Sequence, residues 1–328
     1  MAKKVGIPRG LFYYQFYPLW KKFFEELGAE IVVSDNTTKK ILDDGTKSCV
    51  DQACLPVKLF HGHVLNLKDR VDYIFIPRLT SISAKEYICP KFGGLPDMVR
   101  HSIKDLPAVI DVEVNARQSP KGALKAAIQV GGYFSDNISD IRKAYNKAME
   151  SYTCFTAQVK QGEIPFRPMH KEQKKGLKSK KLNIAVIGHV YNLYDEYVNM
   201  NMLRKLEDSG VNIITLDMLE SSVVNQHCGT LEKRMFWNFG RKALGGALCL
   251  AEDKNIDGII YVMSFGCGVD SFVSDLIERK IRRVRDVPFM VLTLDEHSGE
   301  AGMDTRLEAF IDMVGWRYKN ETDFSAHG

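Results

Sequence analysis

The sequence lacks the long apolar segments that secretion and membrane insertion require. Its 328 residues are 45% hydrophobic, but no run of about 18 apolar residues occurs, which a transmembrane helix would need. The first residues, Met1-Ala2-Lys3-Lys4, lead straight into a strand pattern without the apolar segment of a signal peptide. We therefore expect a cytoplasmic protein with no membrane partner, folded into about two domains.

Strong charge and nucleotide-binding motifs are also missing. The formal net charge is only +4, whereas a nucleic-acid-binding protein usually concentrates basic charge on one face, so no nucleic-acid partner is expected. There is no Gly-x-x-x-x-Gly-Lys-Ser/Thr phosphate loop. The glycines from Gly240 to Gly246 do not follow a strand pattern and therefore do not form a dinucleotide fingerprint. We expect that this chain does not hydrolyse ATP itself.

Cysteine is present in an odd number, seven, which makes a disulfide framework a poor explanation and metal binding or catalysis a better one. Four cysteines stand beside turn-forming residues, at the end of a predicted strand or the start of a helix: Cys49, Cys54, Cys89 and Cys267. Glycine and proline beside a thiolate are common around iron–sulfur clusters, because the chain must turn tightly and offer N–H groups to sulfur. We predict these four as metal ligands, and an all-thiolate set favours a four-iron cluster over catalytic zinc. For each of them alone, a packed thiol is the alternative.

The other three cysteines carry weaker signals. Cys154 and Cys249 lie inside helical patterns and are expected in the core. Cys228 precedes a helix next to Gly229, and a role as a further ligand stays open.

Short apolar runs alternate with amphipathic segments along the whole chain. Strands are predicted at residues 5–7, 30–33, 73–76, 108–110, 183–188, 212–214, 258–262 and 289–292. Helices are predicted at residues 11–27, about 139–160 and about 231–252. Apolar strands separated by helices indicate parallel sheets covered on both faces, so the predicted fold class is α/β with two domains.

The strand–helix alternation restarts at Asn183, which sets the predicted domain boundaries. An N-terminal α/β domain covers residues 1–165, a basic linker 166–181 and a C-terminal α/β domain 182–328. The linker is either solvated or a docking patch for an acidic partner. In open sheets ligands bind at the carboxyl ends of strands, so Cys89 and Cys267 are expected to face a cleft between the domains.

Five further residues are candidates for the site. Lys58 and Arg78 stand near predicted strand ends or cleft helices, where a cation neutralises a reduced cluster or binds an anion, and His61 is expected to pack or to hydrogen-bond to cluster sulfur. Glu296 and His297 follow the last predicted strand. They are candidate catalytic residues for proton transfer, with a hydrogen-bonded polar loop as the alternative.

Taken together, the motifs of this chain resemble those of a known family. They are Cys49-x4-Cys54-Leu55-Pro56-x-Lys58, Phe60-His61-Gly62-His63, Ile88-Cys89-Pro90, Gly188-His189-x-Tyr191-Asn192, Ser264-Phe265-Gly266-Cys267-Gly268-x-Asp270-Ser271 and Asp295-Glu296-His297-x-Gly299-Glu300-Ala301-Gly302. Over about residues 4 to 315 the chain is similar to the proteins related to the activators of 2-hydroxyacyl-CoA dehydratases. These in turn are similar to dehydratase cluster subunits and to double-cubane cluster proteins.

The resemblance implies two Rossmann-like domains that hold an oxygen-sensitive iron–sulfur cluster, either 4Fe-4S or an 8Fe-9S double cubane. It implies an electron-transfer protein or reductase of anaerobic chemistry. It also implies a separate ATP-hydrolysing iron–sulfur activator protein as the source of low-potential electrons. A non-catalytic cluster carrier or assembly scaffold, and a 2-hydroxyacyl-CoA dehydratase-type component, are the alternatives. A binding module with incidental cysteines is a further class, and the substrate and a homo-oligomeric state stay open.

Overall fold

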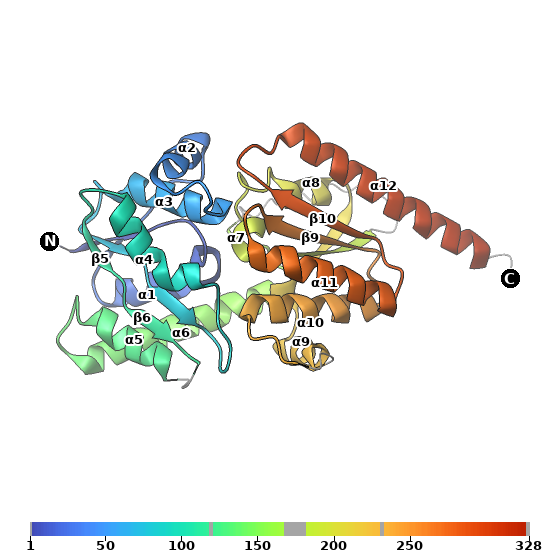
Figure 1. Ribbon diagram of the computed structural model, residues 1–328. Coiled ribbons are helices and arrows are strands. Elements are labelled where there is room, and N and C mark those ends of the chain that lie inside the picture. Colours follow the sequence, from blue (N-terminus) through green and yellow to red (C-terminus); the bar gives the residue numbers. More distant parts are fainter. Residues whose placement is uncertain (1, 118–120, 167–181, 230–232, 326–328) are drawn as a thin grey trace. The chain divides into compact units, whose positions relative to one another are not determined.

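The computed structural model describes residues 2–117, 121–166, 182–229 and 233–325 (Figure 1). The chain divides into two compact units. Unit 1 comprises Met1–Gln161 and Lys233–Arg241, and unit 2 comprises Gly162–Glu232 and Lys242–Gly328. The predicted basic linker, apart from Phe166, lies outside the described residues.

A four-stranded parallel sheet forms the centre of unit 1. Its strands, in spatial order, are β2 (Glu30–Val33), β1 (Lys4–Ile7), β3 (Tyr73–Phe75) and β5 (Ala108–Ile110). A short parallel pair, β4 (Arg78–Ser81) and β6 (Glu113–Asn115), follows β3 and β5 in sequence. Val5, Ile7 and Ile74 are fully buried, as expected for strands that are covered on both faces.

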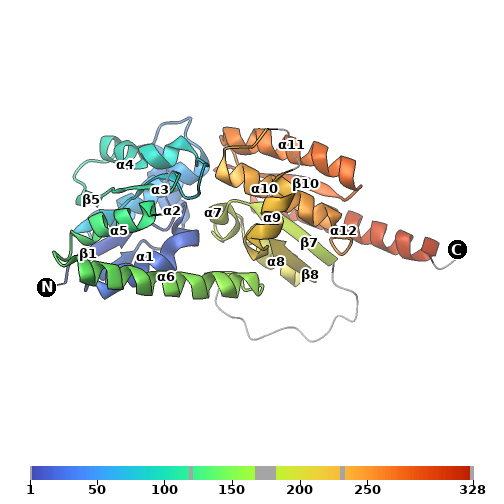
Figure 2. The same ribbon diagram turned by 90° about the horizontal axis from the view of Figure 1, so that it is seen from below.

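Helices cover both faces of this sheet. They are α1 (Tyr13–Glu26), α2 (Lys39–Ser48), α3 (Leu55–Leu67), α4 (Pro90–Ser102), α5 (Gly122–Gly131) and α6 (Ile138–Lys160). Figure 1 shows α3 and α4 on one face and α1 on the other, and in Figure 2 the long helix α6 runs alongside α1. The aromatic ring of Phe24 on α1 packs edge-on against Phe75 of β3, with 5.1 Å between the ring centroids.

Two glycines bring α2 and α3 into backbone contact. A Cβ atom on Gly45 of α2 would lie 2.0 Å from the carbonyl oxygen of Lys58, and one on Gly62 of α3 would lie 1.9 Å from that of Ile41. Any larger residue at either position therefore forces the helices apart. This contact sets the spacing between the helix that ends at Cys49 and the helix that begins after Cys54.

Helix α3 is buried along most of its length and is held to the end of β2 by a histidine. His63 is fully buried, its Nδ1 lies 3.0 Å from Ser34 Oγ, and its Nε2 lies 3.1 Å from Thr37 Oγ1. Burial, assisted by the positive charge of Arg9, lowers the pKa of His63 to about 3.

This histidine should make folding stability depend on pH. The unfolded chain binds a proton at His63 near the ordinary pKa of 6.5, whereas the folded protein does so only near pH 3. Stability is therefore lost as the pH falls from 6.5 toward 3, by about 2 kcal/mol between pH 7 and pH 5. Urea unfolding of the wild type and of His63→Asn at both pH values checks this. Acidification from pH 7 to pH 5 should cost the variant about 2 kcal/mol less folding stability than it costs the wild type. Equal losses in the two proteins would show that His63 does not cause the pH dependence.

A second four-stranded parallel sheet forms unit 2. In spatial order its strands are β10 (Phe289–Leu294), β9 (Gly258–Ser264), β7 (Leu182–Gly188) and β8 (Val211–Thr215). The helices are α7 (Val190–Leu193), α8 (Met202–Asp208), α9 (Ser221–Cys228), α10 (Asn238–Glu252), α11 (Gly268–Val284) and α12 (Glu300–Ser325), with the 3-10 turn η1 (Leu216–Met218) after β8. Helices α8 and α12 lie on one face, where Lys205 pairs with Glu300 at 2.7 Å, and α10 and α11 lie on the other (Figure 1).

A segment from the second half of the chain completes unit 1. Residues 233–241 belong to this unit, so that α10 begins in unit 1 and continues in unit 2. Tyr87 and Trp237 form a parallel β-bridge, and the backbone N–H of Tyr87 donates to the carbonyl of Phe236 at 2.8 Å. This pairing explains why the predicted helix over 231–252 begins only at Asn238.

The buried carboxylate of Glu86 holds the same segment by its side chains. Glu86 is 4% exposed and accepts from Asn238 Nδ2 at 2.7 Å and from Arg234 at 2.8 Å. The guanidinium of Arg241 lies 3.2 Å from the same carboxylate. Because Glu86 is three residues before Cys89, this cluster fixes the loop that carries that cysteine.

The predicted α/β class with parallel sheets is confirmed, and each predicted strand is present. The expected core position of Cys154 is wrong, because this residue is exposed although it lies in helix α6 as predicted. The buried face of α6 follows Ile141, Ala144 and Ala148, and Cys154 projects from another side. Among the described helices, none has the length and apolar character that a bilayer span requires. The cleft between the domains stays a prediction.

Candidate metal centre

Three of the four predicted ligand cysteines stand at the N-termini of helices. Cys54 directly precedes α3, Cys89 precedes α4 and Cys267 precedes α11. Cys49 is the residue at which α2 ends. A helix N-terminus offers unpaired N–H groups and partial positive charge, and both stabilise a thiolate.

Cys49 has two lysines and a second thiol in its electrostatic surroundings. Burial raises the pKa of the Cys49 thiol, while a backbone hydrogen bond from Val50 and the positive charges of Lys58 and Lys91 act to lower it. The thiol of Cys54 acts to raise it. Lys58 is 5% exposed, so unit 1 places a buried cation beside this cysteine pair.

The other predicted cofactor-binding residue on α3, His61, is also fully buried. Its Nδ1 lies 2.8 Å from the Val57 carbonyl oxygen, so this nitrogen donates to the preceding turn of the same helix. Burial lowers the pKa of His61, which keeps the ring neutral near pH 7. Its role toward a cofactor stays a prediction.

Arg78 belongs to a network of four charged groups. Its guanidinium makes a two-pronged contact with Asp97, at 2.6 Å for each nitrogen, and reaches Asp111 at 2.9 Å. Arg100 joins through Asp111 at 2.7 Å. The contact with Asp97 raises the pKa of Arg78 and so keeps it charged. The network ties β4 to α4, the helix that follows Cys89, and the binding of a cofactor by Arg78 stays a prediction.

In unit 2 the ends of two neighbouring strands bring three metal-ligating side chains together. His189 follows β7 and Cys267 follows β9, two strands paired through Gly188 and Val262. In the sheet, β7 lies between β8 and β9, and the chain passes from β7 to β8 before it returns to β9. His189 and Cys267 therefore flank the point where the strand order reverses. In open α/β sheets this switch point is where ligands bind. Asp270 joins them from the first turn of α11.

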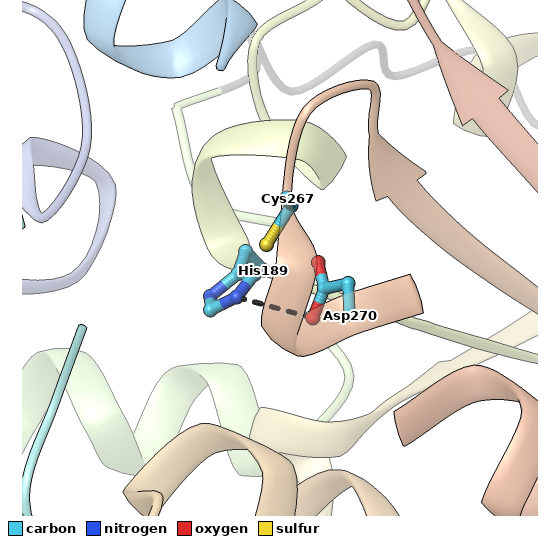
Figure 3. A group of neighbouring side chains, drawn as sticks. All are labelled: His189, Cys267 and Asp270. Atoms are coloured by element: carbon cyan, nitrogen blue, oxygen red, sulfur yellow. Dashed lines mark ion pairs between the residues drawn. The ribbon is translucent and has the colours of Figure 1, made fainter. Parts of the chain in front are cut away.

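Figure 3 shows these three side chains pointing toward one another. Their ligand atoms all lie within 4.8 Å of each other, and His189 Nε2 is 3.5 Å from Asp270 Oδ1. Asp270 is fully buried and accepts a hydrogen bond from Tyr261 at 3.2 Å. The His189 ring stacks on Tyr191 with 4.7 Å between centroids and an interplanar angle of 11°. Burial and the Asp270 charge raise the pKa of Tyr261 well above its usual value, so the hydroxyl stays a donor.

The loop with the two candidate catalytic residues lies at the same edge of this sheet. It follows β10, and the N–H of Phe265, two residues before Cys267, donates to the Leu294 carbonyl at 2.8 Å. The His297 side chain is 85% exposed and that of Glu296 is 20% exposed, with 4.0 Å between their charged atoms. Proton transfer by this pair stays a prediction.

Sequence reasoning assigned no chemical role to His189, Asp270 or Tyr261. His189 and Asp270 stand in motifs that carried the family resemblance, and the position of His189 directly after a strand was the available signal. Tyr261 lies inside an apolar strand and gives no signal in the sequence. Its hydroxyl acquires a partner only because Asp270 folds back onto β9.

The fold and these side chains define an α/β protein built on parallel sheets, with three potential metal-ligating side chains at the strand ends of unit 2. The chain belongs to the family described as the CoA enzyme activase uncharacterised domain, which matches residues 4–219. Residues 147–314 match the 2-hydroxyglutaryl-CoA dehydratase, D-component. The resemblance seen in the motifs is thereby confirmed, and the two matches support a dehydratase-type component. No curated protein matches the chain.

Solved structures give only distant similarities. One is a complex of SsGBP with GDP, 12% identical, which covers 99% of this chain and 100% of that chain at a TM-score of 0.25. Another is a dinucleotide-forming acetyl-coenzyme A synthetase 1 from Ca. Korarchaeum cryptofilum, 12% identical, covering 97% and 67% at a TM-score of 0.25. The glycosyltransferase SnogD from Streptomyces nogalater is 10% identical, covering 96% and 95% at a TM-score of 0.22. TM-scores this low support no inference about this chain.

Proposed function

We propose that this chain is the iron–sulfur component of a 2-hydroxyacyl-CoA dehydratase-type system and takes up low-potential electrons from a separate activator. The observation that carries the proposal is the position of Cys49, Cys54, Cys89 and Cys267 at helix ends. The two family matches support the same class of protein, since one is an activase domain and the other a dehydratase component.

The donor set fits a thiolate-ligated cluster. Cys54, Cys89 and Cys267 present sulfur where helix N-terminal N–H groups stabilise negative charge. Lys58 and Lys91 place positive charge near Cys49. A cluster held by these thiolates would supply one-electron transfer at low potential. The chain's own contribution is to bind it, to compensate its charge, and to keep Glu296 and His297 available for proton transfer at the same sheet edge as Cys267.

The electron donor is proposed to be an ATP-hydrolysing iron–sulfur protein. The chain has no phosphate loop of its own, so ATP hydrolysis is assigned to the partner. The test is reduction of the cluster-loaded chain by dithionite-charged activator with and without ATP. Faster reduction with ATP supports the proposal, and equal reduction without ATP contradicts it. A carrier or scaffold would be reduced in the same way but would not dehydrate a 2-hydroxyacyl-CoA.

Iron and sulfide content of anaerobically prepared protein tests the cluster itself. About four irons per chain indicate a 4Fe-4S cluster and about eight a double cubane. Cys89→Ser and Cys267→Ser should each lose most of the bound iron, because a hydroxyl replaces a thiolate ligand. Cys154→Ser is the matched control, since that thiol is exposed on α6, and it should keep the wild-type content. A wild type without sulfide, or full iron in Cys89→Ser, would contradict the ligand set.

A further inference from the structure

We propose that His189, Cys267 and Asp270 bind a single divalent transition-metal ion in the cluster-free protein. The site goes beyond the proposed function, because all three donors lie in unit 2 and none of them needs the cysteines of unit 1. Among the described residues, His189, Cys267 and Asp270 form a group of three potential metal ligands whose ligand atoms lie within 4.8 Å of one another.

The separation of His189 and Asp270 is the first argument. Their facing atoms are 3.5 Å apart, longer than a normal N–H···O hydrogen bond. Two ligands of one tetrahedral ion with bonds of about 2.0–2.1 Å stand about 3.3–3.4 Å apart, which matches this pair. The Cys267 sulfur lies within 4.8 Å of a ring nitrogen of His189 and of a carboxylate oxygen of Asp270, so a contraction of about 1 Å brings it to bonding distance.

The second argument is a carboxylate oxygen whose hydrogen bonding is incomplete. Asp270 is fully buried, and within the described part of the chain its Oδ2 has no hydrogen-bond partner. A buried charged oxygen without a partner is costly, and a cation removes that cost. In Figure 3 this oxygen points to the side of the carboxylate on which Cys267 lies.

The surroundings of the three side chains are those of a prepared metal site. Tyr261 donates to Asp270 from the buried strand β9, and the stacking of His189 on Tyr191 fixes the plane of the imidazole. Metal ligands in proteins are commonly oriented by such outer hydrogen bonds. Cys267 stands at the N-terminus of the 17-residue helix α11, which favours the thiolate form that a metal requires.

The donor chemistry points to a borderline-soft ion such as Zn²⁺, Co²⁺ or Fe²⁺. One thiolate, one imidazole and one carboxylate leave a coordination position open to water or a further ligand. Since one Cys267 thiolate serves one centre at a time in this arrangement, the ion and a cluster ligated by Cys267 exclude each other.

Cobalt(II) binding to the tag-free full-length chain under anaerobic conditions tests the site. A triple variant, Cys49→Ser with Cys54→Ser and Cys89→Ser, removes the predicted cluster ligands of unit 1. We expect it to bind one Co²⁺ per chain with a thiolate-to-cobalt absorption band. His189→Ala in that background should raise the Kd at least about 100-fold, and Tyr261→Phe about 10- to 100-fold. Circular dichroism checks that each variant is folded.

His227→Ala is the matched control, because His227 also pairs with a carboxylate of unit 2, Glu252, at 3.2 Å. It should leave Co²⁺ binding unchanged. No binding by a folded triple variant, or binding that His189→Ala and Asp270→Asn leave unaltered, would overturn the site. Iron without sulfide in the wild type, together with Co²⁺ binding here, would overturn the proposed cluster and leave this inference standing.

Discussion

Gly62→Ala should lower the free energy of unfolding by about 3 kcal/mol or more, although alanine is the better helix former. The added Cβ would lie 1.9 Å from the backbone carbonyl oxygen of Ile41, and a backbone atom cannot rotate out of the way as a flexible side chain does. Helices α2 and α3 must therefore separate. Urea unfolding followed by circular dichroism measures the loss.

Gly94→Ala in helix α4 is the matched control for this substitution. Nothing lies within 4 Å of a Cβ at Gly94, so the change should be neutral or stabilise the protein by about 0.5–1 kcal/mol. If the two variants unfold at the same urea concentration, the close contact between α2 and α3 is wrong. Because Cys49 and Cys54 stand at the facing ends of these helices, Gly62→Ala should also lower the iron content, whereas Gly94→Ala should not.

Glu86→Ala should cost about 3 kcal/mol of folding stability. The carboxylate is buried and compensates Arg241, whose side chain is only 15% exposed, so its removal takes a negative charge away from a poorly solvated cation. The Arg234 side chain is 52% exposed, so water replaces its half of the interaction at little cost. Denaturant unfolding checks the loss, and trypsin should cleave after Arg234 faster than in the wild type.

An exposed ion pair provides the control for Glu86. Glu30 lies 3.8 Å from Lys4 and both side chains are about half exposed, so Glu30→Ala should cost less than about 1 kcal/mol. If Glu86→Ala is as stable as Glu30→Ala, the Glu86 carboxylate does not hold residues 233–241 in unit 1. The result would then favour a loop at Cys89 that is fixed by its backbone alone.

Features that depend on neighbours along the chain can be predicted from the amino-acid sequence. Apolar runs such as Ile184–Ile187 predict buried parallel strands, because a strand covered on both faces needs apolar side chains on both. Proline and glycine beside Cys54, Cys89 and Cys267 placed these thiols at turns, and all three stand at helix N-termini. Strands β4 (Arg78–Ser81) and β6 (Glu113–Asn115) were missed, because each contains a single apolar residue and so forms no apolar run.

Contacts between residues far apart in the chain depend on how the sheets and helices pack. His189 and Asp270 come from separate strand ends, and their pairing follows from the order of β7 and β9 in the sheet. The contact of Tyr87 with Trp237 joins segments from opposite halves of the chain, so no local pattern announces it. Likewise, Arg78 looks like a free cation in the sequence and meets its two carboxylates only when β4 packs on α4. Local propensity acts between near neighbours, whereas a site is made by contacts that only the packing of sheets and helices creates.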